Sequence, residues 1–167
     1  MNAEQLYEKL LAKLRELKQA SSFELVGLAM GGAWIAERLA KDLGLPHYGV
    51  INVAFHRDDY AEKGMTALRT ASTMTTHLPF DVNGATVILI DDVLFTGRSI
   101  RSALTAIQSF GRPSEIELLV LIDRRFSRNL PIQPDYRGRQ VDAINNEKVK
   151  VCWKENDGED GVYLITN

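Results

Sequence analysis

Cysteine, long apolar runs and charge of one sign are all in short supply in this chain of 167 residues. Cys152 is the single cysteine, which excludes a disulfide within the chain and is typical of a reducing compartment. It also excludes a cysteine-ligated zinc site, and no metal-ligand spacing connects the histidines His47, His56 and His77. No apolar run approaches the roughly 20 residues that cross a bilayer. We therefore expect a cytoplasmic protein that does not enter a membrane.

The charge balance and composition are those of an ordinary globular domain. The net charge of −2 argues against general affinity for nucleic acid, although a local basic patch remains compatible with it. Hydrophobic residues make up 45% of the chain and charged residues 25%, which is enough to bury one substantial core. We expect a single domain over residues 1–167.

Apolar periodicity predicts helices and strands in alternation. A leucine stripe at helical spacing marks a helix over residues 3–19, and a second helical pattern, from Trp34 to Leu43, is closed by a glycine and a proline. Thr86–Ile90 is a run of five residues without a charge, as in a strand buried on both faces of a parallel sheet. Further strands are expected at Glu24–Leu28, Tyr48–Phe55 and Ile116–Ile122, and a third helix at Ile100–Phe110. This order predicts an α/β fold with a doubly wound, mostly parallel sheet flanked by helices.

Two segments fall outside this alternation. Residues 57–80 are polar, rich in threonine and without a sustained apolar period, which is typical of a functional lid, and we place a flexible loop at about 57–76. Residues 142–166 have the pattern of short strands separated by polar turns. We expect them to contribute a small hood to the same domain.

One segment carries the chemistry, because a buried strand there ends in two acids and a short loop then enters a helix. The acids are Asp91 and Asp92, and the loop is Phe95–Ser99. In open α/β sheets, ligands bind at the carboxyl ends of the strands, and free N–H groups at a helix N-terminus favour a phosphate. Gly97 lets the backbone approach a ligand closely, and the hydroxyl groups of the loop can donate further hydrogen bonds.

The two carboxylates can hold the hydroxyls of a sugar, or a magnesium ion that bridges sugar and pyrophosphate. The pattern therefore predicts a sugar phosphate with its phosphate in the loop and its ring diol on the acids. A bare acid pair before a helix capped by Ser99 would need no ligand. The whole stretch Val87–Ser99 suits one ligand at every position, and so favours the binding site.

Val87–Ser99 resembles the 5-phosphoribosyl-1-pyrophosphate (PRPP) signature of the type I phosphoribosyltransferases. Further motifs are similar to the bifunctional pyrimidine-operon regulator/uracil phosphoribosyltransferase family: Phe55–Asp59, Phe95–Arg98, Gly111–Ser114, Leu121–Arg124, Leu130–Ile132 and Asp135–Tyr136. The resemblance spans most of the chain from Val26 to about Lys148. It implies the phosphoribosyltransferase fold and the transfer of ribose 5-phosphate from PRPP to uracil, which yields UMP and pyrophosphate with Mg²⁺ as cofactor.

The resemblance also implies roles for single residues. Asp91 and Asp92 would be the catalytic pair, bind the ribose hydroxyls and, with the substrate, hold Mg²⁺. The rest of the PRPP site would be Val93, Leu94, Phe95, Thr96, Gly97, Arg98 and Ser99, with the 5-phosphate on the last four. Pyrophosphate would lie on Met30, Gly31, Gly32 and Arg57, and uracil beside Arg124 and Val149.

Two positions bear on the substrate and the rate. Purine enzymes of this type carry an acid two residues before the loop glycine, where this chain has Phe95. An aromatic ring cannot act as an acid or base, so a pyrimidine is favoured, with orotate or a pyrimidine analogue still open. The family often has a basic residue in the pyrophosphate turn, whereas Met30 and Gly31 offer only backbone. This departure predicts weak PRPP affinity or low turnover.

A regulatory function stays open beside the enzymatic one. Family members bind pyrimidine-operon messenger RNA in response to uridine nucleotides, and residues 124–139 hold five arginines against one acid. The arginines are Arg124, Arg125, Arg128, Arg137 and Arg139. A family basic residue associated with RNA binding is Gln133 here, which lowers this expectation. The alternative is a UMP- and PRPP-sensing RNA-binding attenuator with little catalytic activity. The family also implies a homo-oligomer.

Overall fold

A five-stranded parallel sheet forms the centre of the protein, in the order β2-β1-β3-β4-β5. The computed structural model describes residues 2–53, 75–142, 147–152 and 161–166. The strands of the sheet are β1 (Glu24–Leu28), β2 (Gly49–Ile51), β3 (Thr86–Leu94), β4 (Glu115–Arg124) and β5 (Tyr136–Val141). The predicted doubly wound parallel sheet is confirmed.

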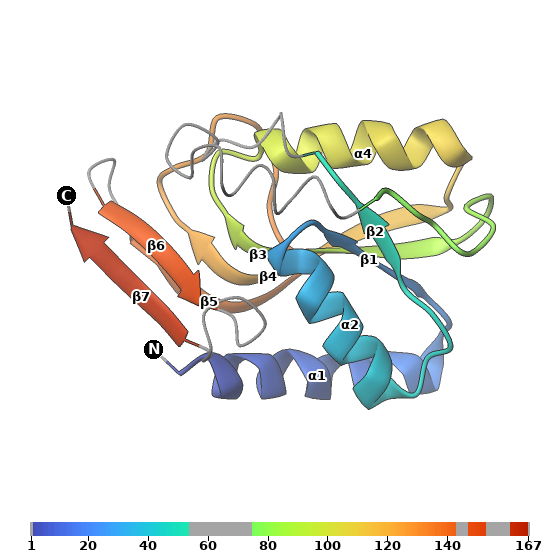
Figure 1. The fold of residues 1–167 in the computed structure, drawn as a ribbon, viewed down its shortest axis with the longest axis horizontal. Coiled ribbons are helices and arrows are strands. Elements are labelled where there is room, and N and C mark those ends of the chain that lie inside the picture. Colours follow the sequence, from blue (N-terminus) through green and yellow to red (C-terminus); the bar gives the residue numbers. More distant parts are fainter. Residues whose placement is uncertain (1, 54–74, 143–146, 153–160, 167) are drawn as a thin grey trace.

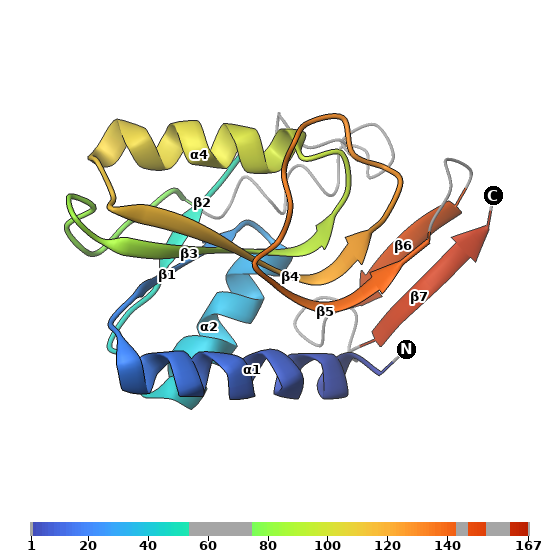
Figure 2. The same ribbon diagram turned by 180° about the vertical axis from the view of Figure 1, so that it is seen from behind.

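Helices cover both faces of this sheet (Figure 1). Helices α1 (Ala3–Ala20) and α2 (Gly31–Leu43) lie on one face, and α4 (Arg98–Phe110) lies on the other (Figure 2). Asn2 caps α1 by accepting two backbone N–H bonds. Gly44 ends α2 at a φ of 69°, a left-handed conformation that favours glycine.

The core consists of two apolar layers, one on each face of the sheet. In β3, Ile88 and Ile90 pack against α1 and α2, whereas Val87 and Leu89 pack against α4. All four side chains are 0% exposed. Because alternate residues of a strand point to opposite faces, a strand covered on both sides must be apolar at every position. This is why Thr86–Ile90 carries no charge.

β4 is slightly longer than predicted, β3 and β2 differ more from their predicted bounds, and β5 was not predicted at all. β3 continues past Ile90 to Leu94, because its pairing with β4 runs on to Leu94 opposite Asp123. The acid pair therefore lies inside the strand rather than after it. β2 ends at Ile51, short of the predicted strand Tyr48–Phe55, whose last two residues lie outside the described part. β5 was not predicted, since its arginines and glycine give no apolar alternation.

A separate antiparallel pair completes the described chain. β6 (Glu147–Cys152) and β7 (Gly161–Thr166) lie beyond the ends toward which the parallel strands run (Figures 1 and 2). They match the short C-terminal strands expected from the sequence, and their role as a hood stays a prediction. The expected flexible loop at 57–76 falls almost wholly outside the described residues. Among the helices that are described, none combines the length and the apolar character that crossing a membrane requires.

Tyr7 connects the two helices that share a face. Its hydroxyl donates a hydrogen bond to Oδ2 of Asp42, with 2.5 Å between the oxygens. Burial and, secondly, this hydrogen bond raise the pKa of Tyr7 above its ordinary value. An unfolded tyrosine ionises near pH 10, while folded Tyr7 keeps its proton. The free energy of unfolding must therefore fall as the pH rises above about 10.

Replacement of Tyr7 by phenylalanine should lower the free energy of unfolding by about 1 kcal/mol at neutral pH, because the hydrogen bond is lost. This difference in stability should shrink at about pH 10.5. Tyr7 ionises there in the unfolded wild-type protein and so stabilises the unfolded state, whereas phenylalanine cannot ionise. Urea denaturation of both proteins at the two pH values measures this. A deficit that stays constant or grows with pH would contradict the role given to Tyr7.

Candidate functional site

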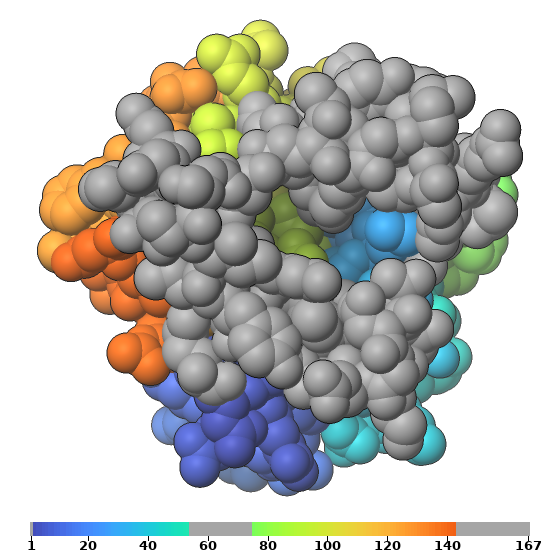
Figure 3. All heavy atoms as spheres, turned by 60° about the vertical axis from the view of Figure 1, so that its left-hand side comes forward, coloured from blue at the N-terminus to red at the C-terminus, as the bar shows by residue number. Residues whose placement is uncertain are grey.

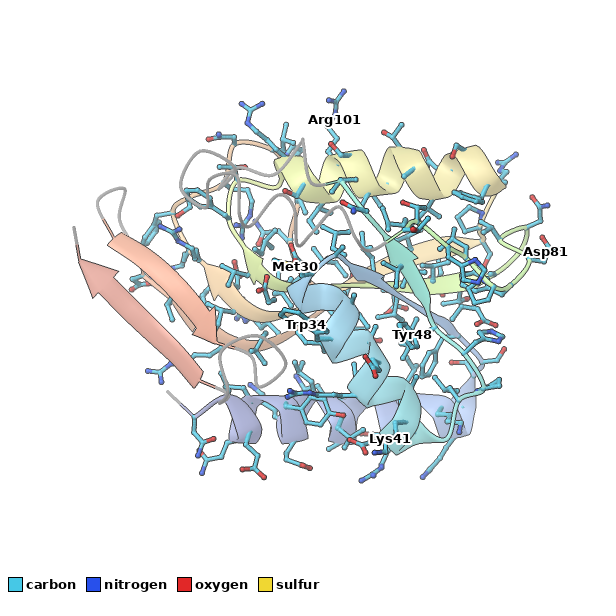
Figure 4. The ribbon with its side chains drawn as sticks, in the orientation of Figure 1. Met30, Trp34, Lys41, Tyr48, Asp81 and Arg101 are labelled. Atoms are coloured by element: carbon cyan, nitrogen blue, oxygen red, sulfur yellow. The ribbon has the colours of Figure 1, made fainter. Side chains whose placement is uncertain are left out.

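The site lies where the strand order reverses, between β1 and β3. These strands are neighbours in the sheet, but the chain leaves β1 toward β2 and leaves β3 toward β4. Such a switch point opens a crevice at the carboxyl ends of the two strands. Figure 4 shows Met30 at the amino end of α2, directly after β1. Seen from the carboxyl ends of the strands, blue atoms of the β1–α2 segment and green atoms of the β3–α4 segment lie together in a hollow (Figure 3).

The turn after β1 lies directly against the end of β3. A Cβ atom added to Gly31 would lie 2.7 Å from Cγ of Asp92, closer than any real side chain could sit. A Cβ atom added to Gly32 would lie 3.0 Å from Cα of Asp91 and would also meet the carbonyl oxygen of Ile90. The turn can therefore contact the acids only because these positions are glycines. The predicted pyrophosphate turn and the predicted ribose-binding acids thus lie against each other.

The two acids differ in burial. Asp91 is 3% exposed, whereas Asp92 is half-buried. Oδ1 of each carboxylate accepts the N–H of the next residue at 2.8 Å. Asp92 lies on the side of the sheet that α2 covers, because Gly31 at the start of α2 touches its side chain. Asp92 is therefore the acid whose side chain contacts the turn, whereas Asp91 meets Gly32 through its backbone.

The loop after the acids leads into α4 through Gly97. Gly97 is the N-cap residue at a φ of 95°, and as a glycine it has no side chain with which to cap the helix. Thr96 is buried and its Oγ1 accepts the N–H of Arg98 at 3.3 Å. The alternative in which Ser99 caps the helix is therefore wrong. The amino end of α4 has the backbone geometry that suits an anion.

Not every residue of the predicted PRPP segment can present its side chain to a ligand. Leu94 is 1% exposed and belongs to the core beneath α4, and Val93 packs against the core on the opposite face. Leu94 can therefore contact a substrate only through its backbone, whereas Val93 is half-buried and part of its side chain stays accessible. The side chains of the segment that are exposed or half-buried are those of Asp92, Val93, Phe95, Arg98 and Ser99.

Phe95 and Arg124 connect the loop to the end of β4. The guanidinium carbon of Arg124 lies 4.1 Å from the centroid of the Phe95 ring, and Arg124 is 6% exposed. A buried cation over an aromatic face is a favourable contact. The structure therefore brings the predicted uracil-side arginine to the loop. Val149 lies in β6, where only the backbone is described, and Arg57 lies outside the described residues.

The five clustered arginines do not form one free surface. Arg124 and Arg128 are turned inward, with the Arg128 side chain 14% exposed. Arg125 forms an ion pair with Asp142 at 2.8 Å, and Arg137 lies 3.4 Å from Asp123. Arg125, Arg137 and Arg139 remain exposed. The cluster offers RNA fewer charges than the sequence predicts.

Asp123 is the residue that sequence reasoning passed over. It is 0% exposed at the end of β4, and its carboxylate accepts hydrogen bonds from Arg128, Arg137 and Gln140. The sequence does contain a signal for Asp123: it follows an apolar run, as Asp91 does, and several arginines come after it. The sequence alone does not show its role, because its hydrogen-bond partners lie five, fourteen and seventeen residues away in the chain.

A metal ion at this site would need ligands from the substrate. In the part of the chain that the structure describes, no three or more His, Cys, Asp or Glu side chains gather as metal ligands. Mg²⁺ commonly binds one or two carboxylates and takes its remaining ligands from phosphates and water. Asp91 and Asp92 fit that pattern.

Comparison with known proteins identifies the family. Residues 1–156 match the model of the phosphoribosyl transferase domain. The chain is 44% identical over 169 residues to the "Bifunctional protein PyrR" of Ralstonia nicotianae, which covers 99% of this chain and 94% of that protein. This chain belongs to the PyrR family of phosphoribosyl transferase domains. The PyrR protein of Elusimicrobium minutum is 41% identical over 150 residues, covering 87% of this chain and 81% of its own.

Solved structures agree with the fold of this PyrR-family chain. A purine phosphoribosyltransferase from Pyrococcus horikoshii has a TM-score of 0.62 at 25% identity, over 83% of this chain and 82% of its own. The hypoxanthine phosphoribosyltransferase of Trypanosoma cruzi has a TM-score of 0.65 at 15% identity, over 98% of this chain and 93% of its own. The second likeness concerns the fold alone.

The contact between turn and acids can be tested with Gly31→Ala in this PyrR-family protein. The added methyl group would displace Asp92 or the turn, so the affinity for UMP should fall on the order of 10-fold or more, as for the loss of a charged hydrogen bond. Isothermal titration calorimetry measures the affinity. Gly84→Ala is the control, because that glycine has a φ of 74° with open space around it, so only backbone strain of about 1 kcal/mol is added. Equal UMP affinity in both variants would contradict the proposed contact.

Proposed function

We propose that this protein is a uracil phosphoribosyltransferase, which transfers ribose 5-phosphate from PRPP to uracil to give UMP and pyrophosphate. The observation that carries the proposal is the contact of Gly31 with Asp92 beside the amino end of α4. It joins surfaces suited to a pyrophosphate, a ribose and a phosphate at one switch point. Membership of a family whose curated relatives are named bifunctional PyrR proteins supports the same activity.

The substrate fits along the end of β3 in a definite order. Asp91 and Asp92 accept hydrogen bonds from the ribose hydroxyls, since a carboxylate is an acceptor with two oxygens. The 5-phosphate lies on the backbone of residues 96–99, at the amino end of α4. Pyrophosphate lies on the turn Met30–Gly32, where only backbone is offered, and Arg57 is the side chain proposed to reach it. The missing basic side chain in the turn predicts weak PRPP binding.

The base lies beside the pair formed by Phe95 and Arg124, with Val149 as a further contact. Phe95 occupies the position where purine enzymes carry an acid, and it can neither donate nor accept a proton. Its ring instead supports the buried Arg124 at 4.1 Å. This replacement of an ionisable group by a stacked pair favours uracil over a purine.

The reaction needs no strong base from the protein. Positive charge develops on the ribose as pyrophosphate departs, and Mg²⁺, held by the substrate with Asp91 and Asp92, would neutralise charge on that leaving group. The residues of the chain hold the two ends of PRPP apart, with the phosphate on α4 and the pyrophosphate on the turn. Backbone donors already in place stabilise charge without having to reorganise.

The direct test is formation of UMP from PRPP and uracil with magnesium, with orotate, hypoxanthine and adenine assayed in parallel. Turnover with uracil alone, abolished by EDTA and restored by excess Mg²⁺, is the expected result. Turnover with hypoxanthine or adenine would contradict the reasoning from Phe95. A lack of turnover with any base, despite saturable UMP binding, would make the regulator the leading function.

Asp92→Asn tests the role of the acid within the same assay. The amide keeps the size of the side chain but loses its charge, so kcat/KM for PRPP should fall roughly 10- to 100-fold. Asp81→Asn is the control, because Asp81 lies far from the start of α2 (Figure 4) and accepts only a local N–H from Asn83 among its described bonds. Equal activity of both variants would show that the carboxylate of Asp92 takes no part.

We propose as the alternative, or as a second activity, a UMP- and PRPP-sensing RNA attenuator in the cytoplasm, acting as a homo-oligomer. The exposed arginines Arg125 and Arg139 support it, and the inward position of Arg124 and Arg128 weighs against it. Binding of a pyrimidine-operon leader RNA in the presence of UMP should be lost in Arg125→Glu with Arg139→Glu, and should weaken steeply with salt. Unchanged binding in this double variant would place the RNA elsewhere.

A further inference from the structure

Arg128 reaches back from the segment after β4 to the loop proposed to hold the 5-phosphate. Its Nη1 donates to the carbonyl oxygen of Phe95, and lies 3.5 Å from that of Leu94 and 3.4 Å from that of Arg124. Its Nε donates to the carbonyl oxygen of Ile132 at 2.8 Å. One guanidinium thus joins the backbone of the loop to the backbone of its own segment.

The next carbonyl group of the loop is held by the same segment. The carbonyl oxygen of Thr96 accepts the backbone N–H of Asn129 at 2.9 Å and that of Leu130 at 3.3 Å. Three successive carbonyl groups, those of Leu94, Phe95 and Thr96, are therefore turned toward residues 128–130. Gly97 allows this approach, since a Cβ atom there would lie 3.3 Å from Cδ1 of Ile132 and 3.6 Å from Cδ of Arg128.

The orientation of these carbonyl groups also sets the direction of the N–H groups. In a trans peptide, the C=O of one residue and the N–H of the next point to opposite sides of the same rigid plane. When the carbonyls of residues 94–96 face the Arg128 segment, the N–H groups of Phe95, Thr96 and Gly97 face away from it. That opposite side is where the amino end of α4 would meet a phosphate.

A buried acid holds Arg128 in this position. Asp123 is 0% exposed and pairs with Nη2 of Arg128, so the guanidinium is bonded on several sides at once. Arginine suits this place because its planar group presents donors in fixed directions, which a lysine ammonium cannot do. Rotation of Arg128 out of the interior would leave Asp123 with only Arg137 and Gln140 among its described partners.

We propose that Arg128 is a positioning residue for the 5-phosphate. It does not touch the substrate but orients the peptide planes of residues 94–97, so that their N–H groups are already directed at the phosphate. The inference rests on the proposed function, because it assumes that this loop binds the 5-phosphate. Donors fixed before binding cost less conformational entropy when the ligand arrives.

The test compares a ligand that has the phosphate with one that lacks it. In Arg128→Lys, which keeps a positive charge beside Asp123, UMP affinity should fall about 10- to 100-fold, whereas uridine affinity should change less than about twofold. The KM for PRPP should rise by a similar factor, with kcat changed much less. Arg137→Lys is the matched control: it bonds the same acid at 3.4 Å, and none of its described bonds reaches the loop. It should keep the wild-type ratio of UMP to uridine affinity.

A second variant covers the case in which Arg128→Lys does not fold. Arg128→Gln combined with Asp123→Asn removes both charges, so that no buried charge is left unpaired. It should show the same selective loss of UMP binding, together with shifted amide signals of Phe95, Thr96 and Gly97 in NMR spectra. An unchanged UMP-to-uridine ratio in the folded variant, or an equal loss for both ligands, overturns the inference.

The failure of this inference can be distinguished from failure of the proposed function. A wild-type protein that binds UMP but forms none from PRPP and uracil lacks the enzymatic activity, and the affinity ratio still decides the role of Arg128. A wild-type protein that binds UMP no better than uridine has no 5-phosphate site, which overturns both.

Discussion

The site depends on how closely the turn after β1 approaches the end of β3. Parallel pairing of these strands brings their carboxyl ends together, and the absence of side chains on Gly31 and Gly32 lets the turn rest on the two acids. A methyl group on either glycine would collide with Asp92 or with the backbone of β3. The surfaces proposed for pyrophosphate and for ribose are therefore held against each other by steric contact, through the backbone of β3 at Gly32 and through the Asp92 side chain at Gly31.

The opposite side of the site is held by charge instead of close packing. Asp123 is buried at the end of β4 and forms an ion pair with Arg128. The same guanidinium donates hydrogen bonds to carbonyl groups of the loop. A buried ion pair contributes little net stability, because desolvation of both charges offsets their attraction. It does impose a definite geometry, since an unpaired charge in that place would be costly. Phe95 and Arg124 add a second connection between the same two segments.

The glycine contact at the turn and the Arg128–Asp123 pair at the loop would affect PRPP binding in the same way. Both ends of the substrate would meet backbone groups whose direction is set before binding, by glycine contact at the turn and by carbonyl anchoring at the loop. Preorganised donors are the means by which a protein stabilises developing charge without a strong acid or base. The turn Met30–Gly32, which offers only backbone groups, is consistent with such a mechanism. It also explains why residues outside direct contact with the substrate matter for its affinity.

Much of this molecule follows from local sequence. Thr86–Ile90 was recognisable as a doubly covered strand because none of its residues is charged, and the order of strands and helices predicted the doubly wound sheet. The acids and the loop up to Ser99 were recognisable because their chemistry lies within a few consecutive residues. Tertiary structure alone decided the rest: that β5 joins the sheet, that Gly31 touches Asp92, and that Arg128 faces inward while Arg139 does not. Each of these depends on contacts between residues far apart in the chain, and periodicity and composition carry no information about such contacts.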